Sequence, residues 1–157
     1  MYYFILPWKI VSYFTSFIKA VSLYIRCCQY IFEDDILIVS HSIAIVDDEH
    51  DTVQLFKDIL TTNGYDVAGF TNPLLAFQYI KENQEEFDLI LCDYKMNPIN
   101  GCDFARKIAT EVNTTITIIL ITAANGIVNN PLNLPVYFKP LLMSKLIDIV
   151  KQSIASV

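Results

Sequence analysis

Short apolar runs rich in β-branched residues alternate with helical repeats in the chain after residue 40. The apolar runs predict five strands, at residues 42–46, 65–70, 87–91, 115–121 and 136–138. Between and after them, apolar residues recur every three or four positions and predict helices at about 51–62, 73–83, 102–111 and 142–156. This alternation is typical of a parallel sheet with helices on both faces. The sequence therefore predicts a doubly wound α/β domain.

Polar residues stand where four of these strands end. Asp47 and Asp48 follow the first strand, Asp93 the third, Thr122 the fourth and Lys139 the fifth. In a doubly wound sheet, the functional crevice lies beyond the carboxyl ends of the strands. We therefore expect three carboxylates, a hydroxyl and an ammonium to converge at one edge of the sheet.

Such a group of side chains has a chemistry of its own. Three carboxylates repel one another unless one is protonated or a cation is bound, and oxygen ligands suit Mg²⁺. With that charge neutralised, one carboxylate can attack phosphorus and carry an acyl phosphate. Asp93 stands alone after an apolar strand and is the best candidate for the nucleophile, while the paired Asp47 and Asp48 are typical of metal ligands. Thr122 could donate a hydrogen bond to a phosphoryl oxygen, and Lys139 could pair with it.

Each of these residues also has an ordinary structural interpretation. The acids at 47–49 could favour the dipole of the following helix, and Asp93 could be a cap or turn residue. Thr122 could be only a strand former and Lys139 only a solvated charge. Four such placements at strand ends are harder to explain by coincidence than by function.

Four stretches of the sequence resemble the receiver domain of two-component response regulators. They are IAIVDDEHD at 43–51, LILCDYKMNPING at 89–101, IILITA at 118–123 and YFKP at 137–140. The resemblance covers about residues 40–157. It implies a flavodoxin-like sheet of five parallel strands in the order 2-1-3-4-5.

The resemblance also implies which residues hold the phosphoryl group and the metal. Asp93 would be the phosphoacceptor. Asp47 and Asp48, together with Asp93 and the backbone carbonyl of Lys95, would bind Mg²⁺. Magnesium is thus the expected cofactor.

Three further residues have implied roles. Thr122 would be the switch hydroxyl, Lys139 the lysine that pairs with the phosphate, and the peptide bond before Pro140 would be cis. The donor would be a histidine kinase or a phosphotransfer protein. Because we expect no output domain after the receiver pattern, the signal would pass by contact with an unidentified downstream protein, or through the N-terminal segment. The expected protein is a cytoplasmic phosphoacceptor that can autodephosphorylate, and not a turnover enzyme.

Two features depart from the pattern of the family. Receivers commonly have Tyr or Phe three residues before the lysine, whereas this chain has Val136 there and Tyr137 one place later. A shift of one residue along a strand turns a side chain to the other face. The segment between Thr122 and Lys139 is short and rich in Asn, Gly and Pro, so the fourth helix is predicted to be short or absent.

Two other functions remain as alternatives. A pseudo-receiver would keep the acidic pocket as an interaction module without switching, which the departures at Val136 and in the fourth helix favour. A haloacid dehalogenase type of phosphatase would also use a strand-end aspartate, but that family requires a second acid two residues after the nucleophile. Lys95 occupies that position and counts strongly against the phosphatase.

Residues 1–32 follow a different pattern from the rest of the chain. Polar residues recur every three or four positions opposite an apolar face, which predicts an amphipathic helix whose polar face carries Lys19 and Arg26. Its uncharged run is short for a membrane-spanning helix. Three interpretations are open: a helix that attaches to a membrane surface or a partner, an extra helix packed on the domain, and a start codon assigned too early. We divide the chain into an N-terminal segment, 1–39, and a receiver-like domain, 40–157.

Charge and cysteine content narrow the function further. The 157 residues include 11 basic and 17 acidic side chains, a formal charge of −6, which argues against direct binding to nucleic acid. Residues 1–32 contain basic residues and no acid, so the rest of the chain is more acidic than this average.

The chain has four cysteines, Cys27, Cys28, Cys92 and Cys102. Because no two of them have the C-x-x-C spacing, the sequence predicts neither a zinc site nor a disulfide framework, and it favours a reducing compartment.

Overall fold

The computed structural model describes one part of the chain, residues 40–84, 86–112, 116–123 and 129–155. The chain divides into two units at residue 40, and the described residues all belong to the second unit, Ser40–Val157. The amphipathic helix expected over residues 1–32, with Cys27 and Cys28, lies outside the described residues. Within the described ranges, every helix falls short of the length and apolar character that a membrane span requires.

Five parallel strands form one sheet in the order β2-β1-β3-β4-β5. β1 lies between β2 and β3, and β4 lies between β3 and β5. The strands are β1 Ser42–Val46, β2 Asp66–Phe70, β3 Leu89–Asp93, β4 Thr117–Thr122 and β5 Val136–Phe138. The predicted doubly wound sheet and its strand order are confirmed.

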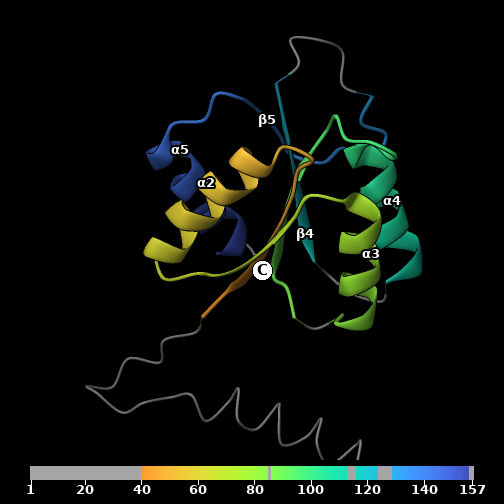
Figure 1. Cartoon of the computed structure of the whole chain (residues 1–157), viewed down its shortest axis with the longest axis horizontal. Helices are drawn as coiled ribbons and strands as arrows, with labels where there is room; N and C mark the ends of the chain where they lie inside the picture. The colour runs from red at the N-terminus through yellow and green to blue at the C-terminus, as the bar shows by residue number, and fades with distance from the viewer. Residues whose placement is uncertain (1–39, 85, 113–115, 124–128, 156–157) are drawn as a thin grey trace, which may run out of the picture. The chain divides into compact units, whose positions relative to one another are not determined.

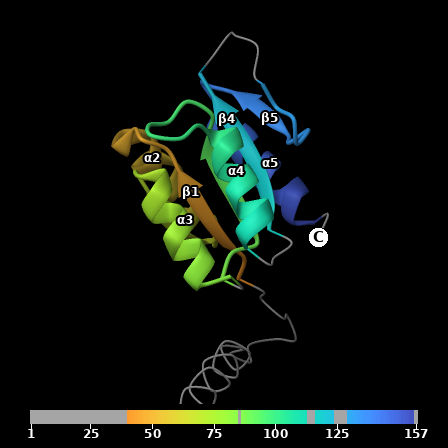
Figure 2. The ribbon, with the colours of Figure 1, turned by 90° about the vertical axis from the view of Figure 1, so that its right-hand side faces the viewer.

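Two helices cover each face of this sheet (Figure 1 and Figure 2). α2 (His50–Thr62) and α5 (Met143–Ile154) lie on one face, and α3 (Pro73–Glu82) and α4 (Gly101–Glu111) lie on the other. Each pair of helices packs its apolar side against the strands, which gives one hydrophobic core on each face. The helices begin and end within two residues of their predicted bounds.

The central strands are buried on both faces, because consecutive side chains of a strand point to opposite sides. In β1, Ile43 and Ile45 pack in the core with α2 and α5, whereas Ala44 and Val46 pack in the core with α3 and α4. A continuous apolar run is therefore the expected sequence for such a strand.

Cys92 and Cys102 behave as small apolar residues. Both are free and buried, and both belong to the core on the α3 and α4 face. Burial raises the pKa of the Cys92 thiol well above its ordinary value, which keeps it protonated and unreactive.

β3 and β4 each begin two residues later than the apolar pattern predicts. Asp88 marks the beginning of β3, because its carboxylate accepts a hydrogen bond from the Ser42 backbone N–H at 2.9 Å and fixes the entry to the strand. The ladder between β3 and β4 then continues as far as Asp93. Asp93 and Thr122 are consequently the last residues of their strands and not the first residues after them.

The connection between β4 and β5 contains no helix in its described part, residue 123 and residues 129–135. This agrees with the predicted loss or shortening of the fourth helix. A side-chain amide organises the segment instead. Asn130 Nδ2 donates to the Leu134 carbonyl at 2.7 Å, and the Leu134 N–H donates to Asn130 Oδ1 at 3.0 Å. We call residues 130–134 the Asn130 turn.

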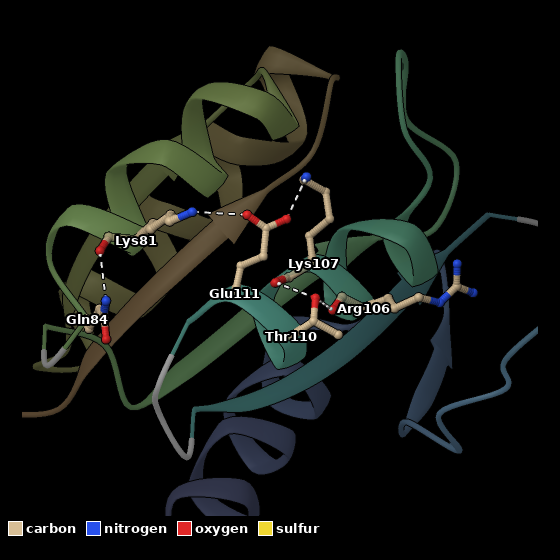
Figure 3. Close-up of polar contacts among 6 residues, drawn as sticks. All are labelled: Lys81, Gln84, Arg106, Lys107, Thr110 and Glu111. Atoms are coloured by element: carbon tan, nitrogen blue, oxygen red, sulfur yellow. Dashed lines mark hydrogen bonds and ion pairs between the residues drawn. The ribbon is translucent and has the colours of Figure 1, made fainter.

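One carboxylate joins the two helices on the α3 and α4 face (Figure 3). Glu111 of α4 accepts hydrogen bonds from Lys81 of α3 and from Lys107 of α4, each at 3.0 Å. Hydrogen bonds from these two lysines lower the pKa of the Glu111 carboxyl below its ordinary value of 4.5. Because the three side chains are partly exposed, water screens the interaction and its contribution to stability is small.

Replacing Glu111 with glutamine is expected to lower the thermal unfolding midpoint slightly at pH 7. A carboxyl whose pKa is lowered by folding stabilises the protein above its ordinary pKa, and this contribution is lost as the pH falls through the folded value. The difference between the parent and Glu111→Gln should therefore disappear in acid below pH 4.5. The control is Glu82→Gln, which removes an exposed α3 carboxyl that accepts from Gln78. A difference that grows in acid would contradict the role given to Glu111.

Candidate functional site

The carboxyl ends of β1, β3, β4 and β5 bring four of the predicted residues to one edge of the sheet. Asp47 directly follows β1, Asp93 and Thr122 end β3 and β4, and Lys139 directly follows β5. Asp47, Asp93 and Thr122 are buried. Carboxylates are seldom buried unless a partner compensates their charge, so Asp47 and Asp93 each require a positively charged partner.

Lys139 supplies that charge to both carboxylates at once. Its Nζ lies 2.5 Å from Asp47 Oδ2 and 2.9 Å from Asp93 Oδ1. The exposed fractions of the three side chains are 16% for Lys139, 5% for Asp47 and 7% for Asp93. The bridge is thus largely withdrawn from water, where charge pairs interact more strongly than at the surface.

Backbone donors satisfy the other oxygens of the two carboxylates. The Glu49 N–H donates to Asp47 Oδ1 at 2.9 Å, and the Lys95 N–H donates to Asp93 Oδ2 at 2.6 Å. The first bond closes a turn directly before α2, and the second fixes the carboxylate of Asp93 over the loop that follows β3. Both carboxylates are therefore held in one orientation.

Burial and the bridge act in opposite directions on Asp93. Burial raises the pKa of the Asp93 carboxyl above its ordinary 3.8, while the hydrogen bond and the charge of Lys139 lower it only in part. The result is a raised pKa, so the negative charge on Asp93 costs stability at neutral pH. A second positive charge at this carboxylate would be favourable.

The balance at Lys139 is the reverse. Burial lowers the pKa of the Lys139 ammonium, but hydrogen bonds to Asp47 and Asp93 and their negative charges outweigh it and raise the pKa above the ordinary 10.5. Lys139 therefore keeps its positive charge at neutral pH. The site contains a fixed cation between two buried acids.

Backbone contacts join the ends of β4 and β5. The Lys139 N–H donates to the Thr122 carbonyl at 2.8 Å, which places these two residues side by side. The Lys139–Pro140 peptide bond is cis, and so is the Asn97–Pro98 bond in the loop after β3.

Asp48 and the side chain of Lys95 are exposed and take no part in the Lys139 bridge. In the part of the chain that the structure describes, no three His, Cys, Asp or Glu side chains are grouped as a metal site would require. Two of the three expected carboxylates thus meet, and the cation between them is an ammonium. The donors still suit Mg²⁺, because Asp47 and Asp93 already direct carboxylate oxygens toward one positive charge.

Gly101 belongs to the site although the motifs do not single it out. Its N–H donates to the Tyr94 carbonyl at 2.9 Å, and a Cβ at this position would lie 2.4 Å from the carbonyl oxygen of Asp93. Only glycine allows the first turn of α4 to approach the end of β3 this closely. In the sequence, Gly101 is marked only as a poor helix former at the start of a predicted helix, and this signal is weak by itself.

The Tyr137 ring of β5 faces away from the α3 and α4 side. Val136 packs against the core with α3 and α4, whereas Tyr137 packs against the core with α2 and α5. The Lys145 Nζ lies 5.8 Å from the centre of the Tyr137 ring. The expectation that a shift of one residue turns this ring to the other face is confirmed.

Comparison with known proteins adds an independent line of evidence. A family model described as the response regulator receiver domain matches residues 43–131. The response regulator receiver protein CpdR of Brucella abortus (strain 2308) is 32% identical over 89 residues, which are 57% of this chain and 72% of CpdR. The transcriptional regulatory protein ZraR of Klebsiella oxytoca is 32% identical over 85 residues, 54% of this chain but only 18% of ZraR.

A solved structure has the same fold. It is the crystal structure of a CheY-like response regulator receiver domain protein from Methanospirillum hungatei JF-1, with a TM-score of 0.67 and 22% identity. The similarity covers 75% of this chain and 96% of that chain. The chain therefore shares its five-stranded sheet and two helical layers with the Methanospirillum hungatei protein.

Proposed function

Since this chain belongs to the response regulator receiver domain family, we propose that it accepts a phosphoryl group on Asp93 in the presence of Mg²⁺. The donor is a histidine kinase or a phosphotransfer protein, so the chain takes part in a histidine-to-aspartate phosphorelay. It works as a phosphoacceptor that can autodephosphorylate, and not as an enzyme that turns over a substrate.

The contact between Asp93 and Lys139 carries this proposal. In the transfer, a carboxylate oxygen of Asp93 attacks phosphorus and forms an O–P bond. The P–N bond of the phosphohistidine breaks, and its electron pair returns to the imidazole nitrogen. Phosphoryl transfer is catalysed mainly by positioning and by positive charge at the phosphoryl oxygens. The Lys139 ammonium, 2.9 Å from Asp93 Oδ1, already supplies such a charge.

Magnesium is assigned to the carboxylates of Asp47, Asp48 and Asp93 and to the backbone carbonyl of Lys95. The chemistry of these donors supports the assignment, because Mg²⁺ prefers hard oxygen ligands and keeps several waters. When bound, the ion neutralises charge on the phosphoryl oxygens. The raised pKa of Asp93 is a further argument, because this buried carboxylate gains from additional positive charge.

Thr122 and Lys139 are assigned to the phosphoryl oxygens. The Thr122 hydroxyl would donate a hydrogen bond to one of them, and the Lys139 ammonium would form an ion pair with another. The Lys139 backbone N–H donates a hydrogen bond to the Thr122 carbonyl at 2.8 Å, so a displacement of one residue also moves the other.

A donor protein has to bring its phosphohistidine to Asp93, and apolar side chains lie beside the site. Phe138, Leu142 and Met143 flank Lys139 in the sequence and are 54%, 76% and 58% exposed. Exposed apolar side chains of this kind favour contact with another protein. Membrane attachment through residues 1–32 stays a prediction from the sequence pattern alone.

A pseudo-receiver that binds partners without switching is the second candidate. Val136 in place of an aromatic residue and the lack of a helix in residues 129–135 favour it. The haloacid dehalogenase type of phosphatase is disfavoured, because Lys95 occupies the position of its second acid.

Incubation of the full chain with Mg²⁺ and acetyl phosphate is expected to add the mass of one phosphoryl group. The label should be stable in acid and labile in base, as an acyl phosphate is, and it should be absent from Asp93→Asn. Asp58→Asn, which changes an exposed carboxyl of α2, should be labelled like the parent. The measurement is intact mass spectrometry.

Stability serves as the control for Asp93→Asn. Because burial raises the pKa of Asp93, its charge opposes folding at pH 7, and the neutral asparagine is expected to be at least as stable as the parent. Loss of the label in a folded variant would then locate the phosphoryl group. A label that persists in Asp93→Asn, or no label under conditions that modify another receiver, would refute the proposed function.

A further inference from the structure

Tyr94, the residue after Asp93, has its backbone held from two sides. Its N–H donates to the Ile121 carbonyl of β4 at 3.0 Å, and its carbonyl accepts a hydrogen bond from the Gly101 N–H of α4 at 2.9 Å. These two bonds hold the backbone of Tyr94 to the end of β4 and to the first turn of α4, and the chain itself joins it to Asp93 at the end of β3.

The Tyr94 hydroxyl extends to the connection between β4 and β5. It accepts a hydrogen bond from the backbone N–H of Asn129 at 3.2 Å, across 35 positions of sequence. The ring packs against the same core as Leu134 of that connection and Val136 of β5. A length of 3.2 Å is at the long end of the range for N–H···O bonds, so a small displacement is enough to break this bond.

The same connection leads back to the site at its other end. After Asn129 come the Asn130 turn and β5, which is three residues long and ends directly before Lys139. Lys139 in turn contacts the Asp93 carboxylate at 2.9 Å. The segment from Asn129 to Lys139 is thus attached at its two ends to the adjacent residues Tyr94 and Asp93.

No side chain of β5 takes this place on the α3 and α4 face. Val136 lies on that face but has neither a ring nor a hydroxyl, and Tyr137 packs on the opposite face. Phe138 has no hydroxyl and is mostly exposed. Tyr94 approaches the connection from β3 instead.

We infer that Tyr94 transmits the phosphorylation state of Asp93 to residues 129–135. Its bond to Asn129 is made in the unphosphorylated chain and broken in the phosphorylated chain. A phosphoryl group on Asp93 draws the Lys139 ammonium from the carboxylate bridge to the phosphoryl oxygens, and this pulls on the connection while the ring of Tyr94 stays with β3. The inference rests on the proposed function, since it requires that Asp93 is phosphorylated.

The test follows the Asn129 amide by NMR in the ¹⁵N-labelled full chain, with and without Mg²⁺ and beryllium fluoride as the phosphoryl analogue. In the parent, the exchange of this amide with water is expected to accelerate about three- to tenfold on loading, as the loss of one hydrogen bond implies. In Tyr94→Phe the exchange should already be fast without the analogue and should no longer respond to it. Acetyl phosphate should label Asp93 in this variant as in the parent.

Tyr137→Phe is the matched control, because it removes a tyrosine hydroxyl on the other face of the sheet. Its Asn129 amide should respond to loading as in the parent. A response that persists in Tyr94→Phe, or an Asn129 amide that does not respond in a parent labelled by acetyl phosphate, would refute the inference alone. A parent that takes no label at Asp93 would refute the proposed function and the inference with it.

Discussion

Replacing Lys139 with methionine is expected to destabilise the domain by about 3–5 kcal/mol at pH 7, the range found when one partner of a buried ion pair is removed. Methionine fills a similar volume but leaves the Asp47 and Asp93 carboxylates without a positive charge. Both are nearly inaccessible to water, at 5% and 7% exposure, so the solvent cannot replace the ammonium. The loss is therefore one of unpaired buried charge and not of packing.

The pH dependence of this loss has a defined direction. An ammonium whose pKa is raised by folding contributes its full stability below the ordinary value of 10.5, and this contribution is lost as the pH rises through the folded pKa. The difference between the parent and Lys139→Met is thus complete at pH 7. In acid it should become smaller. Burial raises the pKa of Asp93 and Lys139 lowers it, so removing Lys139 leaves the pKa higher. The Asp93 carboxyl then takes up a proton at higher pH, which relieves its repulsion with Asp47.

Urea unfolding at pH 7 and at pH 5 measures both parts of this prediction. Lys57→Met, which makes the same substitution at an exposed position of α2, should change the free energy of unfolding by no more than about 0.5 kcal/mol. An equally small change in Lys139→Met at pH 7 would show that the bridge adds nothing to stability. A difference that widens at pH 5 would contradict the assignment of the loss to carboxylate charge.

The fold and the edge that carries the site follow from local properties of the sequence. A run such as SIAIV at 42–46 is apolar at every position, which predicts a strand buried on both faces. Parallel strands end at the same edge, so Asp47, Asp93, Thr122 and Lys139 could be placed together before any contact was known. The strand order came from the resemblance to receivers, because periodicity alone does not tell which strands are neighbours.

Contacts between distant segments could not be predicted in this way. Lys139 meets Asp47 across 92 positions, and Tyr94 meets Asn129 across 35. Such contacts depend on separations that are fixed only when helices and strands have packed, and they leave no spacing or period in the sequence. For the same reason, the sequence does not distinguish Asp47, which is buried in the structure, from its neighbour Asp48, which is exposed.

Gly101→Ala tests the close approach of α4 to the end of β3. Helix propensity alone predicts that alanine stabilises the first turn of α4 by up to about 1 kcal/mol. The structure predicts the opposite. The new Cβ would lie 2.4 Å from the Asp93 carbonyl oxygen, 3.0 Å from Leu120 Cδ2 and 3.1 Å from the Tyr94 Cα. Two of these three atoms belong to the backbone, so a side-chain rotation cannot remove the overlap.

We expect Gly101→Ala to lower the free energy of unfolding by about 2 kcal/mol, within the range for overpacked interiors. Labelling of Asp93 by acetyl phosphate should slow roughly tenfold, because reacting groups displaced by about 1 Å react far more slowly. Gly64→Ala separates the two effects. Gly64 has a φ of +88° and open space around it, so alanine there should cost about 1 kcal/mol in backbone strain and leave the labelling rate unchanged. If Gly101→Ala were as stable and as quickly labelled as the parent, α4 could withdraw freely from β3, and its first turn would have no part in holding Asp93.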